Sequence, residues 1–272
     1  MVCAGPVRTS TRTPTTIPAL VALALLAVGC GASGTTTGTR ASVPQAPAPA
    51  VATAGAELWL SFDDVQAGFD GSPEYGDAQG GLITGRVVTA NGGEVRDVAG
   101  GTGRGGAVAF PGTCTDATGC PRALVEVPTD PSLDPGDAPF SWGASVRLPP
   151  DETSAGSNVV QSGRYGSDGD QWKLQVDGEE GLPSCILRAE GEIVKIRSST
   201  SVSDGAWHRV VCRRDADVLS IEVDGDVHRK PVVTGSVHTG LPVRIGSPGV
   251  GDHDDQFHGE IDDVVIDVDP RP

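Results

Sequence analysis

The sequence is poor in aromatic side chains and in positive charge. Aromatic residues make up 4% of the 272 residues, and only three of the 20 basic residues are lysine. Against 36 acidic residues this leaves a formal net charge of −16 at pH 7. A chain this acidic is repelled by nucleic acid and by anionic lipid headgroups. We therefore exclude nucleic acid as a partner and retain divalent cations and neutral or basic partners.

Several motifs of catalysis and metal binding are also missing. The chain contains no G-x-S-x-G, no H-E-x-x-H and no C-x-x-C. These are signatures of serine hydrolases, zinc proteases and zinc fingers, respectively. A linear D-x-D-x-D-G loop is absent as well, which excludes an EF-hand. The five histidines are scattered along the chain, and no internal repeat appears.

No hydrophobic run is long enough to span a bilayer comfortably as a permanent helix. The apolar run at residues 17–28 is broken only by Pro18 and preceded by two charges, Arg8 and Arg12. This pattern predicts an export signal over residues 1–29. The run ends in LLAVGC, which resembles a bacterial lipobox, so Cys30 would become the lipidated first residue of a membrane-anchored lipoprotein. An ordinary secretory signal, giving a secreted protein, is the alternative.

The segment that follows, residues 30–56, is predicted to be a disordered linker. After Cys30 it contains almost only Gly, Ala, Ser, Thr, Pro, Val and Gln, and Arg40 is its single charge. Such a composition cannot bury enough apolar surface to fold. A tether of this length reaches on the order of 30 Å, enough to hold a domain off the outer face of the membrane. Residues 57–272 then remain for one large domain.

Short alternating stretches dominate this domain, and no convincing helix pattern appears. ELWLSF, FSWGASVRL, WKLQV and VLSIEV all place apolar and polar residues in turn. This period of two is typical of half-buried antiparallel strands. About a dozen such strands in one domain favour two packed sheets or a closed barrel, because either arrangement leaves few strand edges bare.

Four cysteines lie in the predicted domain and support an oxidising compartment. Four cysteines allow three pairings. We favour a short loop closed by Cys114 and Cys120, and a bridge between two strands made by Cys185 and Cys212. Both members of the second pair lie on the apolar faces of their strands, as a cross-strand or inter-sheet disulfide requires.

Four stretches follow one another in a fixed order along the domain. They are LWLSFDD, GRGGAVAFPG, SVSDGAWHRVVCRRDADVLSIEVDGDV, and PVRIGS followed by QFHGEIDDVVI. Together they resemble the laminin-G-like, concanavalin A-like jelly-roll domains, over nearly all of residues 57–269. The resemblance implies an all-β sandwich of two curved antiparallel sheets in which the first and last strands are neighbours. It also implies a module that binds a carbohydrate or a surface protein.

Many members of this family hold one calcium ion near the rim of the sandwich. The resemblance therefore implies a structural calcium site whose ligands come from both ends of the domain. Asp63 and Asp70 would meet Asp262 or Asp263 from the closing strand. The alternative is that these acids only solvate turns, where Asp is common in any case.

One branch of the family is catalytic and uses Glu-x-Asp-x-x-Glu on one strand. The closing stretch HGEIDDVVIDVD offers Glu260 and Asp262, but Val265 stands where the second glutamate should be. We therefore predict no enzymatic activity. Instead, we read this stretch as a closing strand with its apolar residues in the core, across a local irregularity, and its acids in water. A degenerate or atypical glycan-processing enzyme and a purely structural envelope lipoprotein are the alternatives.

Few aromatic residues are available to stack on a sugar. Trp142 and Trp172 have apolar neighbours that suggest the core, and the resemblance makes Trp207 structural. Trp59 lies on the strand face opposite its leucine neighbours. Tyr165, in the loop SGRYGSDGDQW, is the best exposed candidate for ligand binding. The resemblance makes His208, which follows Trp207, a packing or hydrogen-bonding residue rather than a catalytic one.

Overall fold

The computed structural model describes residues 55–101, 105–116, 118–164, 166, 169–232 and 235–269. All of them belong to the second of the two compact units of the chain, Pro44–Pro272. The predicted signal peptide, Cys30 and nearly all of the predicted linker lie outside the described residues, as does Tyr165. Within the described part, the chain has no helix long and apolar enough to cross a membrane.

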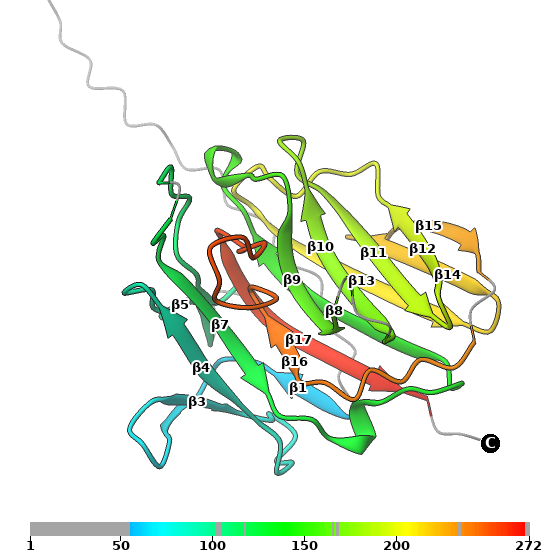
Figure 1. Cartoon of the computed structure of the whole chain (residues 1–272), viewed down its shortest axis with the longest axis horizontal. Coiled ribbons are helices and arrows are strands. Elements are labelled where there is room, and N and C mark those ends of the chain that lie inside the picture. Colours follow the sequence, from blue (N-terminus) through cyan, green and yellow to red (C-terminus); the bar gives the residue numbers. More distant parts are fainter. Residues whose placement is uncertain are drawn as a thin grey trace, which may run out of the picture. The chain divides into compact units, whose positions relative to one another are not determined.

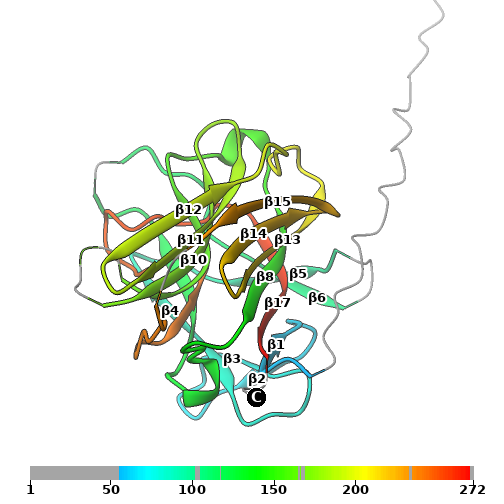
Figure 2. The same cartoon turned by 90° about the vertical axis from the view of Figure 1, so that its right-hand side faces the viewer.

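Two antiparallel sheets make up this unit, as Figures 1 and 2 show. Sheet A has the spatial order β15 (Asp226–Pro231), β14 (Val218–Val223), β13 (Trp207–Asp215), β8 (Phe140–Arg147), β17 (Glu260–Val268), β6 (Gly106–Ala109) and β5 (Arg96–Ala99), and β1 (Leu58–Leu60) also pairs with β17. The predicted all-β, two-sheet jelly-roll sandwich is confirmed.

Sheet B contains nine strands. Their spatial order is β12 (Glu192–Arg197), β11 (Leu182–Ala189), β10 (Gln171–Asp177), β9 (Ser157–Gly163), β16 (Val243–Ile245), β7 (Arg122–Val127), β4 (Thr84–Ala90), β3 (Pro73–Gly76) and β2 (Val65–Ala67). Two short 3-10 turns, Pro131–Leu133 and Pro150–Glu152, are the only helical elements in the described residues.

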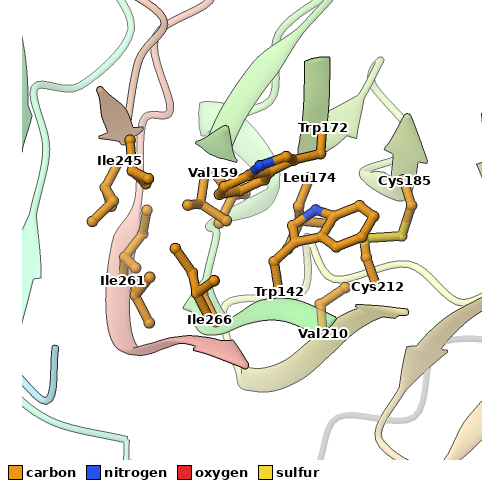
Figure 3. Close-up of a cluster of buried hydrophobic side chains, with 14 of the residues drawn as sticks. Trp142, Val159, Trp172, Leu174, Cys185, Val210, Cys212, Ile245, Ile261 and Ile266 are labelled. Carbon is orange, nitrogen blue, oxygen red and sulfur yellow. A yellow bond between two sulfur atoms is a disulfide. The ribbon is translucent and has the colours of Figure 1, made fainter. Parts of the chain in front are cut away.

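The core lies between the facing sheets, and aromatic rings occupy its centre. Trp142 from β8 and Trp172 from β10 are both fully buried, and their ring centroids lie 5.7 Å apart. Figure 3 shows the two indoles approaching each other from opposite sheets. Phe140 stacks on Trp142 at 4.7 Å. Such aromatic pairs add to the stability gained from burial alone. The core positions predicted for the two tryptophans are therefore confirmed.

Both favoured disulfides are present. Cys185 on β11 bonds to Cys212 on β13 and so joins sheet B to sheet A, as the yellow bond in Figure 3 shows. Cys114 bonds to Cys120 six residues later and closes the loop that leads into β7. Disulfides of this kind persist in oxidising compartments, so the protein is expected to be exported.

The first and last strands are neighbours, as expected. Trp59 on β1 is paired with Val265 on β17, which brings the two ends of the domain together. The register of β17 against β8 shifts between Asp262 and Val265, and Asp263 has a positive φ of 48°. This bulge lets Ile261 and Val264 both face the core, which confirms the predicted irregularity.

The expectation that the acids of β17 face water is wrong for Asp262. Its side chain is only 4% exposed. Its carboxylate accepts hydrogen bonds from the amides of Gly101, at 3.0 Å, and Asp263, at 2.7 Å. Backbone donors thus replace the water that a buried carboxylate loses. The alternation of the strand gave no sign of the loop around Gly101, because that loop comes from a distant part of the sequence.

Candidate binding site

A pocket lies where β1, the β1–β2 connection and the β3–β4 turn meet. After Leu60 the chain leaves sheet A and enters sheet B at β2. Phe62 makes this crossing with a positive φ of 53°, a conformation that is costly for a bulky residue. Its ring is buried and meets the Tyr75 ring edge-on at 5.0 Å. This packing fixes the connection and places Asp63 and Asp64 at the surface.

The pocket has a volume of about 330 Å³. Its lining combines aromatic, carboxylate, amide and hydroxyl side chains with stretches of backbone: Trp59, Ser61, Phe62, Asp63, Asp64, Gln66, Gly76, Asp77, Ala78 and Gly80. Five of these ten residues have polar side chains, so the lining is more polar than the mostly apolar lining of many small-ligand sites.

Trp59 is the half-buried aromatic of this pocket, and its position is fixed from three directions. Its amide donates to Asp77 Oδ1 at 3.1 Å. Its carbonyl oxygen accepts from the amide of Ala78 at 2.7 Å. Its indole Nε1 donates to Asp263 Oδ1 on the closing strand at 2.8 Å. The indole is thus held in place before any ligand arrives, which lowers the entropic cost of binding.

Three carboxylates from the two ends of the domain, Asp63, Asp262 and Asp263, interact with one another, and Asp263 binds the Trp59 indole. Burial raises the pKa of Asp262 to about 7, and the neighbouring charges of Asp263 and Asp63 act in the same direction. Burial also raises the pKa of Asp263, although the Trp59 hydrogen bond and the charge of Arg209 oppose this shift. Burial lowers the pKa of Arg209 to about 10. Its Nη1 donates to the carbonyl oxygen of Asp263 at 3.0 Å, and this hydrogen bond stabilises the bulge of β17.

The structure brings three of the four predicted calcium ligands near one another and leaves the fourth apart. The charges of Asp63, Asp262 and Asp263 interact, and Asp63 Oδ1 accepts from the amide of Gly106 at 2.8 Å. Asp70 lies on the β2–β3 turn, where its Oδ1 accepts from the amide of Ser72 at 2.9 Å. In the described residues no group of three or more His, Cys, Asp or Glu side chains is arranged to hold a metal ion. The calcium site stays a prediction.

The other residues singled out from the sequence lie away from this pocket. Trp207 is 8% exposed, and the Arg147 guanidinium lies over its ring at 5.6 Å. His208 bonds through Nδ1 to Asp224 at 2.6 Å and through Nε2 to Asp204 at 3.0 Å. Burial lowers the pKa of His208, but its hydrogen bonds with the two carboxylates outweigh burial and raise it above the usual value. His208 is thus a hydrogen-bonding residue, as expected.

Glu260, the acid that carried the catalytic alternative, forms an ion pair with Arg147 on the neighbouring strand. Both oxygens of Asp262 accept backbone amides. The two acids of the incomplete motif are therefore engaged in structural contacts. The sequence analysis did not identify Arg209 or Asp77. Nothing in the local sequence shows that Asp77 accepts the Trp59 amide or that Arg209 donates to the Asp263 carbonyl oxygen.

Residues 122–267 match the family model of the concanavalin A-like lectin/glucanases superfamily. The chain belongs to this family. The matched segment includes the last two of the four laminin-G-like stretches quoted from the sequence and ends within the closing strand. No curated protein matches the chain.

Three solved structures are similar to this laminin-G-like domain. Domain 4 of an extracellular arabinanase from Geobacillus stearothermophilus, in complex with arabinotriose, gives a TM-score of 0.57 at 16% identity, with 79% of this chain and 92% of that chain covered. The binding domain of Paraclostridial Mosquitocidal Protein 1 gives 0.53 at 13%, covering 76% and 48%. The binding domain of Botulinum neurotoxin serotype D gives 0.53 at 11%, covering 80% and 48%.

These similarities show a shared fold. The chain spans about half the length of the two toxin binding domains that it matches. All three structures are described as binding domains or as a domain holding a sugar, rather than as catalytic domains.

Proposed function

We propose that this laminin-G-like domain is a non-catalytic module that recognises a carbohydrate through the pocket beside Trp59. The observation that carries the proposal is the half-buried indole, fixed by Asp77, Ala78 and Asp263 and surrounded by polar side chains. The apolar face of a sugar ring packs well on an aromatic ring, while its hydroxyl groups need hydrogen-bond partners.

The polar lining suits a neutral polyol. Asp63, Asp64 and Gln66 are exposed, so they offer oxygens that can accept hydroxyl protons, although Asp63 Oδ1 already accepts the amide of Gly106. A volume of about 330 Å³ is at the lower end of known ligand sites and has room for one or two sugar residues. An anionic sugar would be repelled, because the pocket contains Asp63, Asp64 and Asp77 and no basic residue.

The proposal also includes export of the protein and a lipid anchor at Cys30. We infer that the mature protein begins at Cys30, is lipidated there, and presents its domain at the cell envelope on the tether of residues 31–56. The two disulfides support export. A bound calcium near Asp63, Asp262 and Asp263 would supply positive charge to these acids and lower the pKa of Asp262.

A glycan-array screen tests the sugar ligand. We expect the chain from residue 30 to bind a defined set of neutral glycans, and Trp59→Ala to lower the affinity at least about tenfold, because a buried aromatic contact is lost. Phe69→Ala is the matched control, since Phe69 is an exposed aromatic outside the pocket. The screen is run with calcium and then with a chelator to test the ion. Equal binding by wild type and Trp59→Ala would contradict the proposal.

A surface-protein ligand is the alternative. It is favoured by an open groove of about 570 Å³ beside the Cys114–Cys120 loop, whose lining includes Gly92, Gly93, Pro111 and Pro121. Such a lining exposes backbone groups that could pair with an extended peptide. Arg96 also lines this groove. Binding to a protein partner that Arg96→Ala weakens and Trp59→Ala leaves intact would favour this alternative.

A further inference from the structure

Exposed apolar side chains are concentrated on one edge of the sandwich. Five large apolar side chains are exposed among the described residues, and three of them lie between residues 65 and 82. Phe69 is 109% exposed and Leu82 is 100% exposed, so neither side chain packs on the domain. Together with Val65 they form what we call the apolar edge. Single exposed apolar residues are common on protein surfaces, but three of the five lie on the outermost strand of sheet B and in the turns at the two ends of the next strand, which makes this edge a candidate interaction site.

The apolar edge runs along the outermost strands of sheet B. Val65 lies on β2, the last strand of the sheet, all of whose residues are exposed. Phe69 lies in the β2–β3 turn and Leu82 in the β3–β4 turn, at the two ends of β3. Figures 1 and 2 show these cyan turns projecting from the lower part of the domain. Natural proteins usually protect such an edge with charge or cover.

The described chain begins beside this edge. The amide of Gly55 donates to Gln79 Oε1 at 3.2 Å, and Gln79 Nε2 donates to the carbonyl oxygen of Ala56 at 2.5 Å. Gln79 belongs to the same β3–β4 turn as Leu82. The segment that leads back to Cys30 therefore joins the domain next to the apolar edge.

We propose that the apolar edge docks on the lipid surface that carries the anchor. This inference rests on the lipidation of Cys30 in the proposed function, and adds a second membrane contact to the lipid that the sequence predicts. A short tether keeps the domain at a high effective concentration near the bilayer, so a weak second contact is enough to orient it. Phe and Leu side chains at the interface supply such a contact.

Charge decides which lipid surface fits. Asp63, Asp64 and Asp70 are exposed close to the apolar edge in sequence and carry negative charge. Anionic headgroups repel these acids, so the edge docks best on neutral, zwitterionic lipid. The same acids, together with a β2 of only three residues, disfavour strand pairing between two copies of this chain.

The test places a reporter at the edge. The chain of residues 30–272 is coupled through Cys30 to a maleimide lipid in phosphatidylcholine vesicles whose acyl chains are brominated. We expect the tryptophan introduced by Phe69→Trp to be quenched by bromine. The matched reporter Ile193→Trp, at another exposed apolar position, is expected to stay unquenched. Near-ultraviolet circular dichroism checks that each variant is folded.

A second substitution in the Phe69→Trp chain tests whether Leu82 contributes to docking together with Phe69. Leu82→Ser should lower the ratio of docked to undocked domains about tenfold, because it removes an exposed leucine that docking would bury in lipid. Leu241→Ser, at an exposed leucine elsewhere, should leave the ratio unchanged. Equal quenching at positions 69 and 193, or equal effects of the two serine substitutions, would overturn the proposal. So would self-association in sedimentation that Leu82→Ser abolishes, since a second copy would then cover the edge.

Cys30 is attached to the vesicle lipid by a chemical reaction, so the quenching experiment does not depend on lipidation in the cell or on a sugar ligand. Trp59→Ala should leave the quenching of the tryptophan introduced at position 69 unchanged, while it lowers glycan affinity at least about tenfold. Failure of the docking proposal and failure of the proposed function are thus separate outcomes.

Discussion

Asp262 is the residue whose environment departs most from what its sequence neighbours indicate. The bulge of β17 turns it under the loop at Gly101, where backbone amides bind both of its oxygens. Burial raises its pKa to about 7, whereas an unfolded chain keeps it near the ordinary value of about 3.9. A raised folded pKa means that the folded protein binds the proton more tightly than the unfolded one.

Protonation of Asp262 at low pH stabilises the folded protein relative to the unfolded chain. Stability contributed by protonated Asp262 is fully present below about pH 4 and is lost as the pH rises toward about 7, at roughly 1.4 kcal/mol per pKa unit. We expect the unfolding free energy of wild type to fall between about pH 4 and about pH 7 relative to Asp262→Asn, measured by urea denaturation in the presence of a chelator. Asp215→Asn, at an exposed acid, is the control. Parallel curves for wild type and Asp262→Asn would contradict the shifted pKa.

For Trp59 the local sequence pattern predicts the orientation of the side chain but not its surroundings. Its alternation with Leu58 and Leu60 correctly set it on the outward face, because a strand's side-chain period of two needs only the neighbours. The pocket around it could not be predicted, since Asp77 and Asp263 reach it from other elements. Sequence reasoning found the acids of both chain ends through the resemblance and missed Arg209, which no motif marks.

At the scale of the element, strands with several alternating residues were predictable and short ones were not. The sequence indicated about a dozen strands, whereas the described residues contain 17. β2 and β16 have three residues each, too few to display a period of two. Their pairing depends on neighbours supplied by the fold, so tertiary contacts decide them.

The β14–β15 hairpin is an element whose turn the sequence defines. Asp224 and Gly225 connect the two strands with positive φ values of 51° and 92°, as a tight two-residue turn requires. We expect Gly225→Ala to lower the unfolding free energy by about 1 kcal/mol, because a Cβ is disfavoured at positive φ. Gly76→Ala is the control, since a Cβ there meets only the Gln66 side chain at 3.6 Å. Equal losses for both variants, measured by urea unfolding, would refute the argument.

At the scale of the whole molecule, the two sheets share one core and one covalent link. Both cysteines of the Cys185–Cys212 bridge are fully buried, and the bridge spans 27 residues, whereas Cys114–Cys120 spans six within one loop. In the chain-entropy view a disulfide stabilises by restricting the unfolded chain, and a longer loop gives the larger effect. The two bridges of this domain therefore allow an internal comparison.

We expect the paired substitution Cys185→Ala and Cys212→Ala to lower the unfolding free energy by roughly 3 to 4 kcal/mol, and the pair Cys114→Ala and Cys120→Ala by roughly 2 kcal/mol. The first pair also leaves space in the core, which adds to its cost. Urea unfolding of both variants beside wild type measures the difference. If the loop bridge proved to be the more stabilising of the two, the sandwich would not depend on its inter-sheet link, and the unfolded chain would have to retain contacts between β11 and β13.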